Sequence, residues 1–210
     1  MPVQSKCKIC RRQGAKLFLR GERCLSPKCA FVKKAYAPGP RKKKRPRPLS
    51  EYGKQLREKQ KLRNWYNLSE QKFRQYIMDT LKARGKVADT SAYLIKLLEG
   101  RLDNVIFRLG FAVSRAAARK VVSHGHIIVN GKPINISSYQ VKKGDVIALK
   151  ERSKVKAGFK DLSTVLKKYT APAWLQLNVE KLEGKVTGEP TLEEAASPAD
   201  LLAIFEFYSK

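Results

Sequence analysis

Apolar side chains recur at helical spacing through the middle of the chain. A helix is predicted from Ser50, a plausible N-cap, to about Asn64, where a few tyrosine and leucine side chains make a thin apolar stripe. Ser69 can cap a second helix, and a third is predicted to start near Thr90 and to continue as far as Leu109. The aromatic residues of this region are expected in a core rather than stacked on bases; they are Trp65, Tyr66, Phe73 and Tyr76.

A different pattern, over residues 99–150, predicts two short helices followed by a small sheet. Ser114 is a natural N-cap for the second of these helices. Residues 127–129 form a predicted strand, and the Asn130-Gly131 pair after it is a strong signal for a two-residue hairpin. A module of this kind can present basic side chains to a helical RNA backbone and recognise it by shape.

The second helix of this module carries Arg115 and Arg119 four residues apart, so both are expected on one exposed face. The only two histidines, His124 and His126, have no nucleophile or carboxylate beside them in the sequence, and polar contacts with RNA are expected of them. No pattern typical of acid–base or nucleophilic catalysis is present, so no enzymatic activity is expected. The expected RNA-binding residues of the module are Arg101, Ser114, Arg115, Arg119, Lys120, His124, His126, Asn130 and Lys132.

The C-terminal segment is expected to end in one more helix. Residues 184–200 are acidic and loop-like, and Pro198 suits the first position of that helix. The apolar side chains expected to dock it are Leu201, Leu202, Ile204, Phe205 and Phe207.

The charge of the chain points to an acidic partner. The chain has 210 residues and a formal net charge of +27, with +15 over residues 1–50, +15 over residues 51–160 and −3 over residues 161–210. Nucleic acid is the commonest partner for such an excess, and the C-terminal fifth is expected to face away from it or toward another protein. No apolar run is long enough for a membrane span and no secretory signal is recognisable, so a membrane or secreted protein is not expected.

The four cysteines, Cys7, Cys10, Cys24 and Cys29, form two close pairs joined by a short connector. Four thiolates at such spacing can hold one structural Zn²⁺, and metal binding would supply most of the folding energy of so small and polar a segment. Two disulfides are the alternative, which a chain without an export signal disfavours. A four-cysteine iron–sulfur cluster has compatible spacing and stays open.

Basic residues dominate the segment that follows the cysteines. Residues 37–48 hold four prolines and six basic residues, which predicts an extended arm along phosphates rather than a packed element. The expected RNA-binding residues of the N-terminal part and the arm are Arg11, Arg12, Lys33, Lys34, Arg41, Lys42, Lys43, Lys44, Arg45 and Arg47. Those of the first long helix are Lys54, Arg57, Lys61 and Arg63.

Taken in order, these motifs resemble the bacterial small-subunit ribosomal protein S-four (uS-four) family, in its cysteine-retaining branch. The resemblance spans nearly the whole chain and is carried by the cysteine spacing and by residues 52–63, 101–104, 124–131, 172–175 and 206–210. The family usually reads Pro-Pro-Gly-Gln-His-Gly in the linker, whereas this chain reads Ala37-Pro38-Gly39-Pro40, so RNA contacts of that family loop are not carried over.

The resemblance implies an α+β protein with a discontinuous body. Residues 1–49 would form the zinc module and basic arm, residues 50–98 and 164–210 a helical domain, and residues 99–163 an inserted RNA-binding domain. It implies a cytoplasmic, ribosomal protein that binds the five-way junction of the 16S rRNA 5′ domain and nucleates assembly of the 30S body. It also implies contacts with neighbouring small-subunit proteins, a place beside the channel through which mRNA enters, and an effect on translational accuracy.

Two other functions have some support in the sequence. The same hairpin module is appended to RNA-modifying pseudouridine synthases, but only 60 residues follow position 150, too few for their catalytic domain. A zinc-dependent DNA-binding regulator would need a helix that reads base edges and a comparable affinity for duplex DNA.

Overall fold

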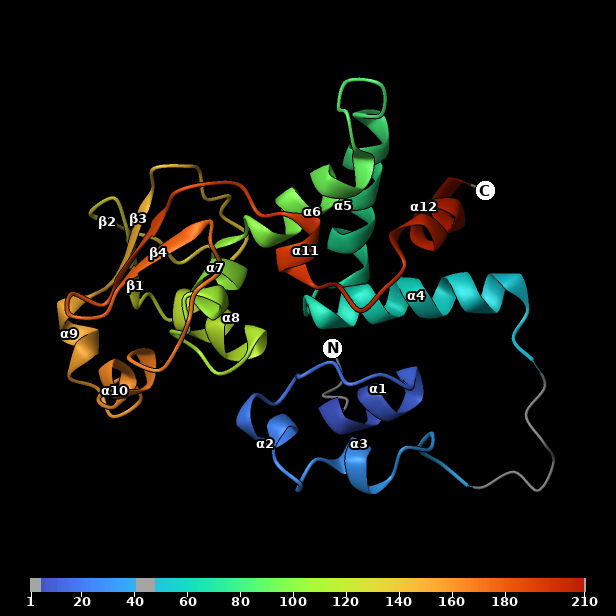
Figure 1. The fold of residues 1–210 in the computed structure, drawn as a ribbon, viewed down its shortest axis with the longest axis horizontal. Helices are drawn as coiled ribbons and strands as arrows, with labels where there is room; N and C mark the ends of the chain where they lie inside the picture. Colours follow the sequence, from blue (N-terminus) through green and yellow to red (C-terminus); the bar gives the residue numbers. More distant parts are fainter. Residues whose placement is uncertain (1–4, 41–47, 210) are drawn as a thin grey trace. The chain divides into compact units, whose positions relative to one another are not determined.

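The computed structural model describes residues 5–40 and 48–209, which divide into two compact units (Figure 1). We call Met1–Leu94 with Ala196–Lys210 the helical unit and Ile95–Ala195 the sheet unit. Within the described part of the chain, no helix has the length and apolar character that a membrane crossing requires. The basic residues from Arg41 to Arg47, which were predicted to contact RNA, lie outside the described residues.

The helical unit starts with three short helices around the cysteines and continues with longer ones. Its elements are α1 (Lys6–Gln13), α2 (Glu22–Leu25), α3 (Ala30–Lys33), α4 (Glu51–Trp65), α5 (Glu70–Lys82), the first half of α6 (Thr90–Glu99) and α12 (Leu201–Ser209). Two of the predicted N-caps are confirmed: the hydroxyl of Ser50 accepts from the Gly53 N–H at 3.2 Å and that of Ser69 from the Lys72 N–H at 3.4 Å. The core of the unit contains Trp65, Tyr66 and Phe73 as predicted, together with Leu62, Ile77 and Ile204, whereas Tyr76 is only half-buried.

The last helix is held on α4 and α5 by polar as well as apolar contacts. The buried Lys59 ammonium lies 2.6 Å from a Glu70 carboxylate oxygen, and the Tyr208 hydroxyl donates to the same oxygen at 3.1 Å. Lys59 also lies over the Phe207 ring, at 4.7 Å from its centroid. Burial alone would raise the pKa of Glu70, but its bonds with Lys59 and Tyr208 outweigh burial and hold that pKa below its ordinary value.

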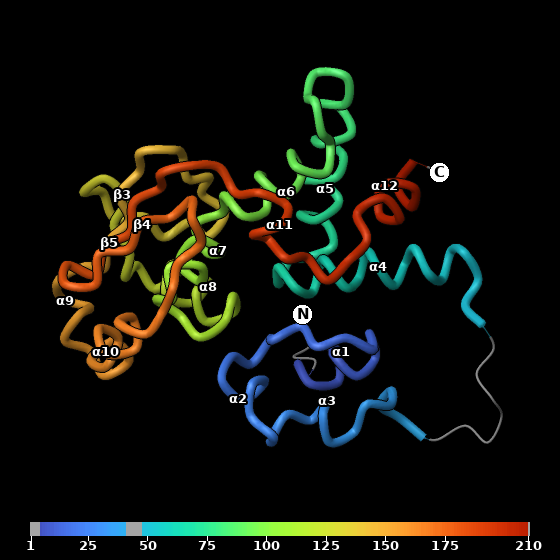
Figure 2. Tube along the Cα trace, viewed as in Figure 1, coloured from blue at the N-terminus to red at the C-terminus, as the bar shows by residue number. Residues whose placement is uncertain are grey.

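The sheet unit packs helices against a five-stranded antiparallel sheet. Its elements are α7 (Leu102–Arg108), α8 (Arg115–Ser123), β1 (Ile127–Val129), β2 (Lys132–Pro133), β3 (Val146–Leu149), α9 (Glu151–Lys154), α10 (Leu162–Leu166), β4 (Leu175–Asn178), β5 (Glu183–Val186) and α11 (Leu192–Ala195). The strand order is β2-β1-β3-β5-β4. Figure 2 labels three of these strands, β3, β4 and β5. Asn130 and Gly131 both have positive φ, at 49° and 78°, as the predicted hairpin turn requires.

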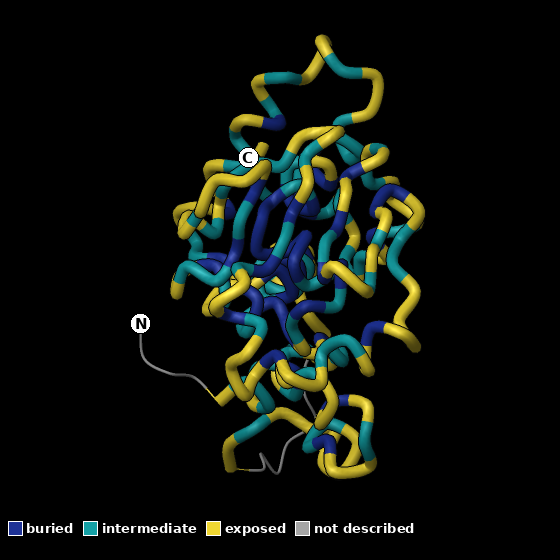
Figure 3. The backbone as a smooth tube through the Cα atoms, turned by 90° about the vertical axis from the view of Figure 1, so that its left-hand side faces the viewer, coloured by how far each residue is buried: buried dark blue, intermediate teal, exposed yellow. Residues whose placement is uncertain are grey.

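The core of the sheet unit joins α7 and α8 to the strands, and Figure 3 marks the buried positions along the backbone in dark blue. Leu102, Val105 and Ile106 of α7 are fully buried, as are Leu109 directly after it and Ala118 and Val122 of α8. β5 approaches this core so closely that a side chain at Gly184 would overlap Leu109. Packing of this density leaves no room for added atoms.

Two expectations about helices in the sequence were wrong. The third helix does not run from Thr90 to Leu109 but breaks at Gly100 and Arg101 into α6 and α7. There the backbone bonds to another segment instead: the Val141 N–H donates to the Gly100 carbonyl and the Leu102 N–H to the Tyr139 carbonyl, both at 2.8 Å. The final helix begins at Leu201 rather than at Pro198, because the Asp200 carboxylate accepts from the first backbone N–H groups of α12.

The expected division of the chain also differs from the observed one. Residues 164–195 were assigned to the helical domain, but they contain β4 and β5, and β5 pairs antiparallel with β3. This pairing places the segment in the sheet unit, which extends over Ile95–Ala195 instead of 99–163. Part of the segment expected to be loop-like forms the short helix α11.

Candidate nucleic-acid interface

The four cysteines come together in the N-terminal module. Cys7 and Cys10 lie on α1, Cys24 lies on α2 and Cys29 precedes α3. All four carry free thiols, and all four line one small cavity. The backbone N–H of Arg20 donates to the Cys24 sulfur at 3.4 Å.

The acidities of the thiols reflect their surroundings. Burial raises the pKa of Cys10, and the nearness of the other three sulfurs raises it further. Burial also opposes ionisation of Cys29, but the Val32 and Phe31 N–H groups, together with the charges of Lys16 and Arg23, outweigh it and lower the pKa of that thiol.

The donor set fits a thiolate-bound metal, although the sulfurs are not gathered around a common point. In residues 5–40 and 48–209, no three His, Cys, Asp or Glu side chains meet at metal-binding distances. The shared cavity and the buried state of three of the four sulfurs are the observations that favour a metal here. Four soft sulfur ligands are the set that structural zinc prefers.

The basic residues predicted in the N-terminal module and on α4 differ in exposure and in how many of them are paired with other groups of the protein. Those with exposed side chains are Arg12, Lys33, Lys34, Lys54 and Arg57. Arg11 lies over the ring of Tyr36, at 5.0 Å from its centroid, and donates to the Tyr36 carbonyl. Lys61 lies 2.6 Å from a carboxylate oxygen of Glu58. Arg63 is anchored at 2.9 Å by Glu70, so Lys61 and Arg63 present less free charge than their sequence positions suggested.

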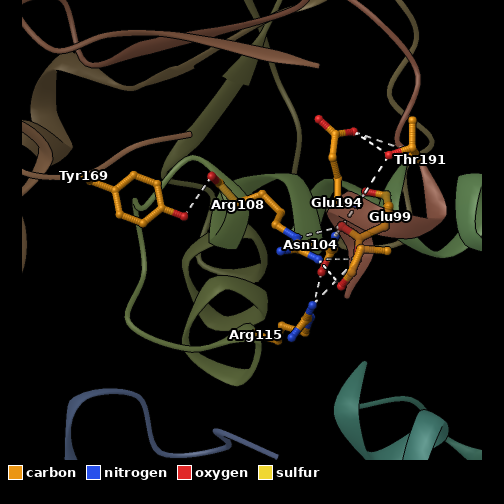
Figure 4. Close-up of polar contacts among 8 residues, drawn as sticks. Glu99, Asn104, Arg108, Arg115, Tyr169, Thr191 and Glu194 are labelled. Carbon is orange, nitrogen blue, oxygen red and sulfur yellow. Dashed lines mark hydrogen bonds and ion pairs between the residues drawn. The ribbon is translucent and has the colours of Figure 1, made fainter. Parts of the chain in front are cut away.

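In the sheet unit, a buried charge cluster occupies the place where an exposed basic face was expected (Figure 4). The carboxylate of Glu99 is fully buried and receives two bonds of 2.9 Å from Arg108 and one from the Asn104 amide. Arg115 donates to Asn104 at 2.7 Å and lies 3.7 Å from Glu99. The guanidinium of Arg115 also covers the Phe107 ring, at 4.6 Å from its centroid.

Three predicted RNA-binding residues of this unit are buried and make contacts within the protein. Arg115 is buried in the cluster instead of sharing an exposed face with Arg119. Arg101 is buried and forms a two-point ion pair with Asp103. The hydroxyl of Ser114 accepts from the Ala117 N–H at 3.3 Å and caps α8, as the sequence predicted for it, but the side chain is buried.

The cluster also joins the beginning of the sheet unit to its end. Arg108 donates to the carbonyl of Ala195 at 2.8 Å as well as to Glu99. The hydroxyl of Tyr169 in turn donates to the carbonyl of Arg108 at 3.0 Å, and burial raises the pKa of that phenol. One guanidinium therefore holds the beginning and the end of the unit at the same point.

Part of the exposed basic surface of the sheet unit lies on α8, directly after it and on the hairpin. Its predicted members Arg119, Lys120, His124 and Lys132 are exposed, as expected. Asn130 is exposed too, but its side chain serves the turn: it donates to Asp145 at 2.8 Å and accepts from the Val146 N–H at 2.9 Å.

His126 differs from His124 in being partly buried. Its Nδ1 lies 2.9 Å from the hydroxyl of the buried Ser153, and its ring meets Phe159 edge to face. Burial lowers the pKa of His126, and the charges of Lys156 and Lys150 lower it further. Because Ser153 is buried, this contact lies within the protein rather than on its surface.

Those two lysines belong to a basic segment that the sequence prediction missed. Residues 150–168 contain seven Lys or Arg and two acidic residues, and α9 and α10 lie within them. The signal was present as a local charge excess, but nothing in the sequence placed it beside the end of α8. The backbone N–H of Lys150 donates to the His126 carbonyl and brings the segment there.

Comparison with known proteins agrees with this architecture. Residues 3–99 match the family described as Ribosomal protein S4/S9 N-terminal domain, and residues 100–147 match the S4 domain. The chain is 48% identical over 208 residues to the small ribosomal subunit protein uS4A of Clostridium novyi (strain NT), which covers 99% of this chain and 98% of that one. It is 47% identical over 204 residues to uS4 of Kosmotoga olearia, covering 97% and 96%.

These matches run from one end of the described fold to the other and take in both units. The chain belongs to the small ribosomal subunit protein uS4 family, whose members are structural, non-enzymatic constituents of the ribosome.

Proposed function

We propose that this protein binds 16S rRNA directly, at the five-way junction of the 5′ domain, and thereby nucleates assembly of the 30S body. The observation that carries the proposal is the net charge of +27, presented on folded surfaces that include α8 and the hairpin. Electrostatic capture would come first, and docking of those rigid surfaces would then select RNA of the right shape.

The proposal also places the protein in the cytoplasm, as part of the ribosome, beside the channel through which mRNA enters. There it would contact neighbouring small-subunit proteins and contribute to translational accuracy. The family resemblance supports these roles. The net charge of −3 over residues 161–210 supports a protein partner for part of this segment, because its acidic side chains would attract a basic ribosomal protein.

A binding comparison tests the RNA proposal. The full chain, supplied with zinc, is titrated against the 16S 5′ domain and against an unrelated structured RNA of equal length at several salt concentrations. We expect a preference for the 16S fragment that persists as salt rises, because shape-dependent contacts are not lost with released counterions. Equal affinities that fall together with salt would mean a simple polycation and would refute the proposal.

We further propose that Cys7, Cys10, Cys24 and Cys29 hold one structural Zn²⁺. When bound, zinc would supply a four-point covalent link between three helices of four to eight residues, which have little apolar core of their own. A strong chelator should then expose the N-terminal module to protease while the sheet unit stays protected. A module that remains protected after chelation would contradict the proposal, and visible absorbance of the purified protein would indicate an iron–sulfur cluster instead.

A further inference from the structure

A cavity of about 430 Å³ lies within the helical unit where α1 packs beside α4. Its α1 wall carries Lys8, Arg12 and Gln13, and its α4 wall carries Gln60, Arg63 and Asn64. We call it the α1–α4 cleft. Its volume is in the range that accommodates a nucleotide-sized group.

The charge of the α1–α4 cleft is of one sign. Three of its lining residues are cationic, although the charge of Arg63 is partly offset by Glu70, and none of the described residues that line it is acidic. Lys8 and Arg12 are exposed, and neither side chain makes an ion pair or hydrogen bond within the described part of the chain. A concave surface lined by charge of one sign focuses its field and concentrates counterions, which isolated surface lysines do not.

The third cation is held in a fixed position. Arg63 is anchored through one terminal nitrogen by Glu70 at 2.9 Å and through the other by Asn64 at 3.3 Å. The amides of Gln13 and Gln60 add directional donors and acceptors beside it. Cations that position a phosphate, together with amides that bond phosphate or sugar oxygens, are the usual composition of a nucleic-acid backbone contact.

We propose that the α1–α4 cleft binds phosphate groups of an RNA strand. This inference rests on the proposed function, and it assigns a particular site to what would otherwise be diffuse attraction. It also links the cysteines to RNA binding, because Lys8 lies between Cys7 and Cys10 on α1, so the order of the cysteine module determines one wall of the cleft.

The test compares two variants that lose the same charge. Lys8→Gln with Arg12→Gln removes two cations from the cleft, and Lys82→Gln with Lys86→Gln removes two exposed cations of the same unit from outside it. Affinity for the 16S 5′ domain is measured across salt concentrations, and phosphate-ethylation interference identifies the phosphates that each protein needs. All four positions are exposed, so folding is preserved, and circular dichroism checks this.

We expect the cleft variant to bind the 16S fragment about tenfold more weakly than the control variant, or more weakly still. We also expect its salt slope, the slope of log affinity against log salt concentration, to be shallower by about 2. Interference should disappear at a small, contiguous set of phosphates, and Arg12→Lys should retain part of the affinity. If the cleft variant matches the control with an unchanged footprint, the proposal is wrong.

A second arm distinguishes strand phosphates from a free anion. Inorganic pyrophosphate is titrated into the full chain without RNA. Submillimolar binding that the cleft variant abolishes, combined with an unchanged RNA footprint, would assign the cleft to a small polyphosphate and overturn the RNA proposal. Failure of the wild-type protein to prefer 16S RNA at all would instead contradict the proposed function, and the two failures are therefore separable.

Discussion

Replacing Glu99 with glutamine should destabilise the sheet unit severely. The substitution keeps the size of the side chain but removes the carboxylate that faces Arg108 and Arg115. Only 1% of the Glu99 side chain is exposed. The exposed fractions of the Arg108 and Arg115 side chains are 16% and 8%. Water therefore cannot replace the lost charge, and two guanidinium groups of like charge are left close together.

The expected cost follows from the burial of this cluster. Removing one partner of a buried ion pair costs about 3–5 kcal/mol, because the remaining charge is left uncompensated. For a unit of about 100 residues, each kcal/mol shifts the melting temperature by about 4–8 °C, so Tm should fall by about 12 °C or more. Glu189→Gln is the matched control: its carboxylate lies 2.6 Å from Lys96 in the same unit, but both side chains are about half exposed or more. An exposed pair of this kind contributes about 0–1 kcal/mol.

The fluorescence of tryptophan provides the assay. The chain has two tryptophans, and Trp174 is buried in the sheet unit whereas Trp65 is buried in the helical unit. Urea and thermal unfolding are followed in a Trp65→Phe background, so that Trp174 alone reports. A loss for Glu99→Gln within about 1 kcal/mol of that for Glu189→Gln would refute the idea that burial of the cluster determines its contribution.

Three further outcomes are expected. Gly184→Ala should cost about 1–3 kcal/mol in urea unfolding, because its Cβ would overlap Leu109, whereas Gly158→Ala, with open space around it, should stay within about 0.5 kcal/mol. Because the pKa of Glu70 is lowered in the fold, stability of the helical unit should be complete above the ordinary glutamate pKa of about 4.3 and fall at more acid pH; Glu70→Gln should flatten that fall in denaturation midpoints measured against pH. Arg119→Glu should lower the salt slope of RNA binding by about 1 and leave Tm unchanged, since the side chain is exposed; a lowered Tm with normal binding would contradict the proposal that Arg119 contacts RNA.

Features that depend on a few neighbouring residues could be predicted from the sequence. The caps at Ser50, Ser69 and Ser114 need only an N–H group three residues ahead, and the Asn130-Gly131 turn needs only positive φ at two adjacent residues. Local hydrogen bonds and backbone preferences decide such features before any tertiary contact forms.

Features that depend on distant partners could not be predicted. Arg115 has the sequence context of an exposed helix face, and its burial depends on Glu99, on another helix. The break at Gly100 depends on Tyr139 and Val141, and the pairing of β5 with β3 joins residues about 40 apart. The α1–α4 cleft is a further case, because α2, α3 and the whole basic arm separate its two walls in the sequence.

The attachment of Arg108 to both Glu99 and Ala195 has a consequence for how such a protein can change through evolution. The chain runs into the sheet unit at Ile95 and out of it at Ala195, and the two ends meet at one guanidinium group. A segment whose ends lie together can be inserted at a single point of a host chain, or removed from it, without stretching the host backbone. The sheet unit can thus be transferred between chains as one segment, because its own side chains hold its two ends together.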